Sequence, residues 1–215
     1  IIAKKASHEY LIYSHDDMYF CPEWEKPLID EINKINHNYF YISGSMIEPN
    51  SGHIKFNCGE NIENFNEQKL LNNLYKLNID DHQGSHFAPH CVHKELWHKV
   101  GGFSEEYNPG IASDPDFNMK LWKTGVRIFK GLNSFKVYHF GSLTTRKNKN
   151  VIQNKGDITF LKKWGMTTSF FKKHYLKSKS AYKGPLEKPK KNFFYFFDLL
   201  KCKIKLSYIK IFNSK

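Results

Sequence analysis

The stretch Tyr10-Leu11-Ile12-Tyr13-Ser14-His15-Asp16-Asp17-Met18 decides the fold class that the sequence predicts. Residues 9–13 form the short apolar and aromatic run of a buried β-strand, and two adjacent carboxylates follow it. In open α/β sheets, ligands bind just beyond the carboxyl ends of the strands. Carboxylates there suit Mg²⁺ or Mn²⁺, which prefer oxygen ligands. The stretch therefore predicts an α/β fold with a metal site, and the alternative is a solvated turn or a helix cap.

A second pair of carboxylates, Asp114 and Asp116, opens the segment 113–125, in which apolar side chains recur on one side as in a short helix. Free amide groups and the helix dipole stabilise anions at a helix start. The pair is therefore explained either as a cap or as a group that includes a catalytic base.

Taken together and in order, four pieces of the sequence resemble the family 2 glycosyltransferases of GT-A fold. They are the strand that ends in Asp16-Asp17, the turn Gly101-Gly102-Phe103-Ser104-Glu105, the acidic pair that opens a helix, and the run Val137-Tyr138-His139-Phe140-Gly141-Ser142. The resemblance extends from about Ala3 to Gly141. It implies a GT-A-like mixed sheet flanked by helices, with a basic C-terminal helical extension. It also implies that the N-terminal part of the nucleotide-binding domain is missing from this chain.

The resemblance assigns roles at the donor side. Asp17 corresponds to the last acid of the family's DxD-type motif and is expected to bind the Mn²⁺ or Mg²⁺ that bridges the donor diphosphate. Asp16 is expected to support it or to contact the donor ribose. His15 stands where the family often has a third acid. His139 is expected to join the metal shell or contact the diphosphate, and the alternative is a polar loop residue.

The resemblance also assigns roles at the acceptor side. Asp114 matches the general base of inverting members, although Ser113 replaces the usual glutamate. Asp116 is expected to orient Asp114 or to bind an acceptor hydroxyl. The Gly101-Gly102 turn borders the acceptor pocket in the family, whereas most such pairs only make turns. Zinc is not favoured in the histidine-rich stretch that precedes this turn, because its spacing fits no standard structural site. There the resemblance predicts hydrogen bonds to sugar hydroxyls, from His82, His86, His90, His93 and His98.

The chemistry of sugar transfer needs these residue types. A divalent cation neutralises the departing diphosphate, and an ionised carboxylate takes the proton of the attacking hydroxyl. One base and one displacement predict inversion at the anomeric carbon. The expected function is transfer of a sugar from a nucleotide-diphosphate donor to a carbohydrate or lipid-linked acceptor.

Charge divides the chain unevenly. Residues 1–150 contain 17 basic and 18 acidic side chains, whereas residues 151–215 contain 16 and 3. We expect a catalytic domain over 1–150, a helical extension over 151–187 and a basic aromatic tail over 188–215. The 215 residues suffice for one sizeable core. The four widely spaced cysteines argue against a disulfide framework and favour a cytoplasmic protein.

The tail combines lysines with the aromatic run 193–197, which suits an anionic membrane surface but is too short and too charged to span a bilayer. The alternative is a terminal element packed on the catalytic domain. Two other functions stay open: a nucleic-acid-binding module that uses this tail, and an inactive carbohydrate-binding fragment.

Local patterns predict a helix over 22–34, a strand over 39–42, and a long loop over 43–61 that contributes to the acceptor site. Two further strands are expected over 126–129 and 135–138.

Overall fold

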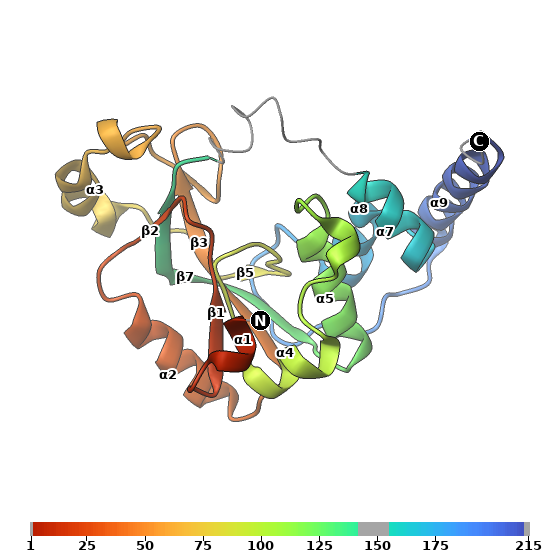
Figure 1. Cartoon of the computed structure of the whole chain (residues 1–215), viewed down its shortest axis with the longest axis horizontal. Helices are drawn as coiled ribbons and strands as arrows, with labels where there is room; N and C mark the ends of the chain where they lie inside the picture. The colour runs from red at the N-terminus through yellow and green to blue at the C-terminus, as the bar shows by residue number, and fades with distance from the viewer. Residues whose placement is uncertain (1, 142–154, 213–215) are drawn as a thin grey trace.

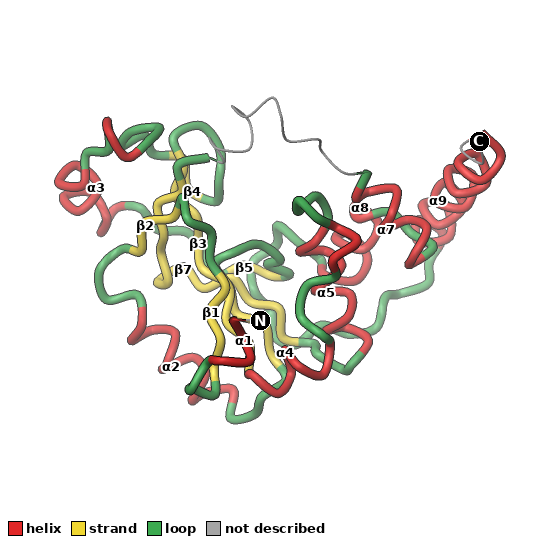
Figure 2. Tube along the Cα trace, in the orientation of Figure 1, coloured by secondary structure: helices red, strands yellow, loops and turns green. Residues whose placement is uncertain are grey.

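The computed structural model describes residues 2–141 and 155–212, and in them a seven-stranded mixed sheet has helices on both sides (Figures 1 and 2). The predicted α/β class with a mixed sheet flanked by helices is confirmed. Ser142, the last residue of the fourth motif, lies outside the described residues.

The strands are β1 (Tyr10–Tyr13), β2 (Met18–Phe20), β3 (Phe40–Glu48), β4 (Ile54–Lys55), β5 (His82–Gln83), β6 (His90–His93) and β7 (Ile128–His139). The helices and helical turns are α1 (Ile2–Lys5), α2 (Glu25–Ile35), η1 (Ile62–Asn64), α3 (Glu67–Asn73), η2 (Leu74–Lys76), α4 (Lys94–Val100), η3 (Glu105–Tyr107), α5 (Ser113–Lys123), α7 (Gly156–Trp164), α8 (Thr168–Phe171), η4 (Lys172–Leu176) and α9 (Phe193–Phe212).

The sheet brings the ends of its two longest strands to one edge. Its spatial order is β1, β6, β3, β7 and β2, with β4 beside β3 and β5 beside β7. β3 and β7 run parallel, and Ile47 pairs with Tyr138 near their carboxyl ends. The short β2 pairs antiparallel with β7, so that Met18 lies opposite His139. This register places the residues that follow β1 against the end of β7.

Two hydrophobic clusters cover the two faces of the sheet. Tyr41 belongs to a cluster that also includes residues of α4, α5, α7, α8 and α9, whereas its neighbours Phe40 and Ile42 belong to a cluster with residues of α2 on the other face. The alternation follows from the pleat of β3, which points successive side chains to opposite faces. Burial of a side chain such as Phe117 or Phe160, both fully buried here, stabilises the fold by roughly 1.5–3 kcal/mol. The first cluster draws on all three segments predicted from the charge distribution.

β3 is longer than the predicted strand 39–42 and takes in residues 43–48 of the predicted loop. Ser43, Gly44 and Ser45 are residues that favour turns, but here they are buried between β6 and β7. Small side chains are required there, because a Cβ atom on Gly44 would lie 2.8 Å from the backbone oxygen of Phe135. The loop prediction was therefore wrong over these residues, and packing space is the reason.

The strands predicted over 126–129 and 135–138 form one strand, β7. The predicted break corresponds to a local irregularity in its pairing with β3. Leu132 pairs with Gly44, and the next pair is Lys136 with Ser45. Residues 133–135 are thus accommodated as a bulge within one strand.

α9 lies within the predicted basic aromatic tail, 188–215, at the end of the molecule far from α3 (Figure 1), whereas the predicted helical extension, 151–187, contains α7, α8 and η4. One side of it packs on the body through Tyr195, Cys202 and Ile209. Within the described residues, none of the helices has the length and apolar character needed to cross a membrane. The cysteines are all buried and free, namely Cys21, Cys58, Cys91 and Cys202.

Candidate functional site

The shared edge of β3, β7 and β2 brings three potential metal ligands together. His15 and Asp17 lie in the turn between β1 and β2, and His139 ends β7. One ligand atom from each of these residues lies within 4.8 Å of the others. The backbone N–H of Phe140 donates to the carbonyl of Asp17 at 3.1 Å, which holds the turn against the end of β7. We call His15, Asp17, His139 and the adjoining Glu48 the metal corner.

Glu48 orients the imidazole of His139. At the end of β3, its Oε1 lies 2.5 Å from Nδ1 of His139, and its Oε2 accepts a hydrogen bond from the Ser51 hydroxyl. A carboxylate on Nδ1 fixes the ring so that Nε2 faces the other side. Nε2 lies 3.3 Å from Oδ2 of Asp17, with which it forms an ion pair when the ring is protonated. Glu48 thus presents the His139 nitrogen to Asp17.

The electrostatics of the metal corner favour a cation. Burial lowers the pKa of His139, but hydrogen bonds and charge from Asp17 and Glu48 outweigh it and raise the pKa to about 9. Without another cation, the imidazolium therefore supplies the positive charge between two carboxylates. Metal binding requires the neutral imidazole and would release this proton. Because two imidazoles and a carboxylate are all metal-ligating groups, and their ligand atoms lie within 4.8 Å of one another, these residues fit a divalent cation.

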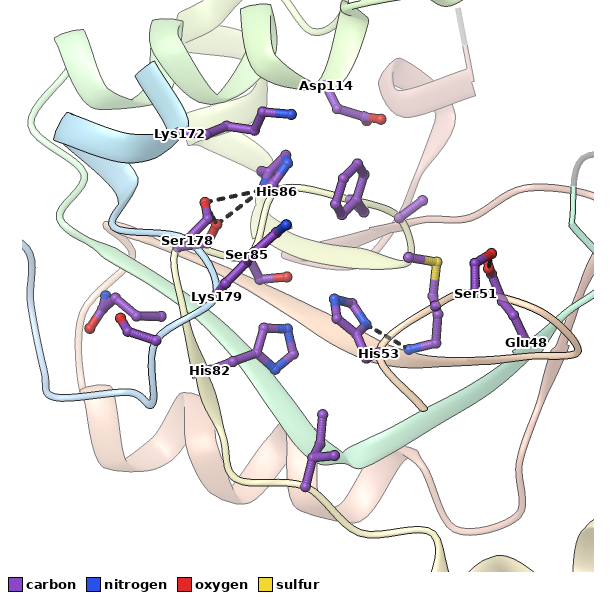
Figure 3. Close-up of a pocket in the computed structure, with 18 of the residues that line it drawn as sticks. Glu48, Ser51, His53, His82, Ser85, His86, Asp114, Lys172, Ser178 and Lys179 are labelled. Atoms are coloured by element: carbon purple, nitrogen blue, oxygen red, sulfur yellow. Dashed lines mark hydrogen bonds between the residues drawn. The ribbon is translucent and has the colours of Figure 1, made fainter. Parts of the chain in front are cut away.

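A cavity of about 1410 Å³ extends from the metal corner across the molecule (Figure 3). His15, Glu48 and His139 line one part of it, and Asp114 lines another. Ligand pockets in proteins are typically about 300–1,000 Å³. The cavity is therefore large enough for two substrates.

Asp114 enters this cavity from the first turn of α5. Helix α5 is preceded at its cap position by Ala112, which makes no side-chain cap hydrogen bond. Asp114 is thus not the cap residue that the alternative interpretation required. Burial raises the pKa of its carboxyl to about 7. A carboxylate with that pKa can both accept and release a proton near neutral pH.

The structure places Asp116 away from the cavity. It is fully buried, accepts hydrogen bonds from the Ser104 hydroxyl at 2.7 Å and Trp164 Nε1 at 2.8 Å, and pairs with Lys163 at 2.9 Å. These contacts tie α5 to α7 and to the turn before η3. A role for Asp116 in acceptor binding stays a prediction that this geometry does not favour.

Gly101 and Gly102 end α4 with positive φ angles of 74° and 61°, where glycine avoids the strain of other residues. A Cβ atom on Gly102 would also lie 2.9 Å from Trp97 Nε1. Neither glycine lines the cavity. Their conformation fits the turn interpretation, and their acceptor role stays a prediction.

One wall of the cavity is formed by lysines of η4 and of the residues that follow it. Lys172, Lys173, Lys177 and Lys179 line it, and we call them the basic wall. Lys173 pairs with Asp198 at 2.7 Å. Within residues 2–141 and 155–212, the other three have no ion pair.

Sequence reasoning missed several of these residues. Glu48 lay in the predicted loop. The only sequence feature that pointed to it was an acid at the position where the predicted strand 39–42 would end if it were extended. His15 was compared with an acid, although an imidazole two residues before Asp17 can itself be a ligand. Asp16 is exposed and lies outside the ligand group, so its donor role stays a prediction.

No protein-family model matches the sequence, and no curated protein matches it. Among solved structures, the crystal structure of GalNAc-T7 with UDP, GalNAc and Mn²⁺ is similar at 15% identity and a TM-score of 0.44. The similarity covers 72% of this chain and 30% of that chain, so this chain spans less than a third of its length. A likeness at this level carries no argument about activity. Membership of glycosyltransferase family 2 stays a prediction.

Proposed function

We propose that this chain carries the catalytic cavity of a glycosyltransferase that uses a divalent cation and a nucleotide-diphosphate sugar. The observation that supports this most directly is one cavity lined by His15, Glu48 and His139 of the metal corner and also by Asp114, whose pKa burial raises to about 7. Sugar transfer from a diphosphate requires a cation for the leaving group and a base for the acceptor. The two requirements are met by separate groups.

The proposed reaction is a single displacement. His15, Asp17 and His139 would hold a divalent cation, which would supply neutralisation of the charge on the departing diphosphate. The acceptor oxygen forms a bond to the anomeric carbon while the bond from that carbon to the diphosphate oxygen breaks. The hydroxyl proton passes to Asp114, and the nucleoside diphosphate leaves. Attack opposite the leaving group inverts the anomeric centre.

The ligand set bears on the identity of the cation. Mg²⁺ strongly prefers oxygen ligands in an octahedral shell, whereas divalent first-row transition metals, of which Mn²⁺ is one, also bind imidazole nitrogens. Two imidazoles with one carboxylate favour Mn²⁺ over Mg²⁺ in this corner. Competition titration of the two ions tests this choice, and tighter Mg²⁺ binding would contradict it.

Calorimetric titration with UDP, GDP and dTDP, each with and without Mn²⁺, tests the proposed function. We expect one nucleotide to bind only with Mn²⁺, and the Asp17→Ala variant to lose that binding. Asp30→Ala is the matched control, because Asp30 is an exposed aspartate on α2 outside the cavity. Metal-independent binding, or no binding by a folded protein, would count against the proposal.

Incubation with the matching nucleotide sugar separates an active enzyme from an inactive carbohydrate-binding fragment. Release of nucleoside diphosphate, accelerated by an acceptor, supports transfer. Donor binding without any turnover, across a panel of acceptors, would favour the inactive alternative.

A further inference from the structure

The basic wall lies across the cavity from the metal corner. Figure 3 shows Lys172 and Lys179 on one side, with Ser178 and His86, and Glu48 and Ser51 on the other. A divalent cation at the metal corner would supply the counter-charge for a donor diphosphate bound there. Unpaired lysines on the opposite side therefore provide positive charge for a second ligand.

The backbone that carries these lysines is unusual. η4 is a π-helix, a form that occurs mostly as single turns and frequently at functional sites. Lys177 and Lys179 follow it with φ angles of 50° and 74°. A positive φ is uncommon outside glycine and costs about 1–3 kcal/mol, so surrounding contacts must maintain it. Because strained backbone is common at functional sites, we infer that these two lysines have a function.

The surrounding contacts are present. The N–H of Gln83 donates to the carbonyl of Ser180 at 2.7 Å, and the Ser178 hydroxyl donates to the carbonyl of Gly84 at 2.9 Å. Gly84 packs so closely on η4 that a Cβ atom there would lie 2.0 Å from the backbone oxygen of Leu176. The basic wall is thus fixed against β5 and the loop that follows it.

A buried polar atom faces the same region. His86 is 5% exposed and lines the cavity. Its Nδ1 lies 3.0 Å from the carbonyl of Gly84, and among the described residues its Nε2 has no hydrogen-bond partner. Burial, the largest influence on this group, lowers the pKa of His86 to about 4, so the ring is neutral at pH 7. With the proton on Nδ1 donated to Gly84, Nε2 is an acceptor for a ligand hydroxyl.

We propose that the acceptor is a phosphorylated sugar or polyol, whose phosphate binds Lys172 and Lys179 and whose hydroxyl donates to Nε2 of His86. The identification of this ligand as the acceptor rests on the proposed function, but its binding site is independent of the metal and the donor. Lysines that meet a phosphate make charge-assisted hydrogen bonds, which are about twice as strong as neutral ones. A neutral sugar would leave three lysines without a partner.

Titration with sn-glycerol 3-phosphate, in 0.15 M salt without metal or nucleotide, tests the site. We expect saturable binding, no detectable binding of glycerol, and weaker binding of inorganic phosphate, which lacks the carbon-bound hydroxyls. The double variant Lys172→Gln/Lys179→Gln should lose at least about tenfold in affinity, an expected loss of roughly 1.4 kcal/mol or more. Lys188→Gln is the control, since Lys188 is exposed and outside the cavity.

The His86→Ala variant isolates the hydroxyl contact. It should bind glycerol 3-phosphate and inorganic phosphate with similar affinity, with a melting temperature that shows it is folded. A variant that keeps the full preference for glycerol 3-phosphate would overturn the role of His86.

A competition arm distinguishes an acceptor phosphate from the donor diphosphate. Glycerol 3-phosphate should still bind after saturation with UDP and Mn²⁺. Displacement by UDP would show that the lysines hold the donor diphosphate, and would overturn the inference while leaving the proposed function intact. Loss of UDP binding in Asp17→Ala with unchanged glycerol 3-phosphate binding would show that the two sites are separate.

A different observation, on α9, carries a second inference. The side of α9 opposite its packed residues exposes a continuous apolar stripe: Phe193, Phe197, Leu200, Ile204, Tyr208 and Ile211 are each 48–75% exposed. These positions recur every three or four residues, which is the spacing of one helix face. With about 3.6 residues per turn, Lys201 and Lys205 lie to one side of this stripe and Lys203 and Lys210 to the other.

Charge decides what can cover this stripe. Residues 188–212 contain seven lysines and one acid, Asp198, and Asp198 already pairs with Lys173 and His174 at 2.7 and 3.0 Å. A second copy of the same helix would repel it. An anionic lipid surface matches both properties, because lysines beside an apolar face bind anionic headgroups while the stripe enters the acyl boundary.

We infer that α9 lies in the plane of an anionic membrane surface through this stripe. The whole chain should sediment with vesicles that contain 30% phosphatidylglycerol and not with pure phosphatidylcholine, because the binding of such a helix depends on its attraction to anionic lipids as well as on its buried apolar area. Ile204→Glu should abolish sedimentation, whereas the control Ile62→Glu, at an isoleucine that is 72% exposed on η1, should not. Tight binding to single-stranded RNA without vesicle binding would overturn the inference and favour the nucleic-acid alternative.

Discussion

The two sides of the cavity suit ligands of opposite charge and are built on different kinds of backbone. The metal corner is built where regular strands end, and strand register alone places Asp17 and Glu48 on either side of His139. The basic wall is built on a π-helical turn and two lysines with positive φ. Opposite charges are paired at the first side, whereas Lys172, Lys177 and Lys179 have no acidic partner within the described ranges. One side is organised for a cation, and the other is organised for an anion.

Removal of the metal corner should have the largest effect. Asp17→Ala takes away the only carboxylate of the three-residue ligand group. Stabilisation of a leaving group by a metal is worth several kcal/mol, so transfer should fall by about a thousandfold or more. The measurement is the release of nucleoside diphosphate from a nucleotide sugar, and Asp30→Ala should match the wild type. Equal activity in Asp17→Ala would remove the metal corner from the mechanism.

Loss of the base between the two sides should come next. Asp114→Asn keeps the shape of the side chain but cannot take the acceptor proton, so the rate of transfer should fall by about 10²–10⁴-fold. Nucleotide binding with Mn²⁺ should be unchanged by calorimetry. Asp157→Asn is the control, because Asp157 is also a first-turn aspartate but is exposed on α7. Weakened donor binding with normal turnover in Asp114→Asn would mean that the roles of Asp17 and Asp114 are exchanged.

Glu48→Gln tests whether the metal corner depends on its supporting carboxylate. The amide oxygen can still accept the proton on Nδ1 of His139, but the negative charge is lost. Replacing such a partner typically lowers metal affinity by about 10–100-fold. This affinity is measured by Mn²⁺ titration, in which the spectroscopic signal of the free ion shows how much Mn²⁺ is unbound. Glu63→Gln is the exposed control. Unchanged affinity would reduce Glu48 to a structural role.

The same contrast explains how much of the site could be predicted. Asp17, Asp114 and His139 were singled out because a strand followed by carboxylates, a helix opened by acids and a strand followed by histidine are local patterns. Those patterns alone left a turn, a cap or a loop residue as alternatives, and the resemblance supplied the roles. The structure places Asp17 and His139 together and Asp114 in the cavity, and their roles stay predictions.

The residues that escaped prediction depend on contacts between distant segments. Glu48 becomes part of the metal corner only because β3 continues through Ser43, Gly44 and Ser45, and space beside Phe135 sets that outcome. The basic wall depends on the hydrogen bond from the Gln83 N–H to the Ser180 carbonyl, two residues that are far apart in sequence. A π-helical turn and positive φ at lysine have no local sequence signature, so side-chain charge alone indicated only a basic segment.

The smallest expected effect is on stability, and it concerns the residue between the two sides. Because burial raises the pKa of Asp114 from 3.8 to about 7, ionising this carboxyl costs more in the folded chain than in the unfolded chain. The wild-type fold therefore loses stability as pH rises from about 4 to 7, and the loss is complete above pH 7. Asp114→Asn cannot ionise, so its melting temperature should exceed that of the wild type at pH 8 and equal it near pH 4.

In a chain of this size, each kcal/mol corresponds to about 2–4 °C in melting temperature. The transfer rate of the wild type should change in the opposite direction, because the base must be ionised: it should fall about tenfold for each pH unit below 7. An identical shift in melting temperature at pH 4 and pH 8 would show that Asp114 does not titrate in this range. If both trends appear, the carboxylate that destabilises the fold at neutral pH is the one that transfer requires, as expected where activity and stability compete at one residue.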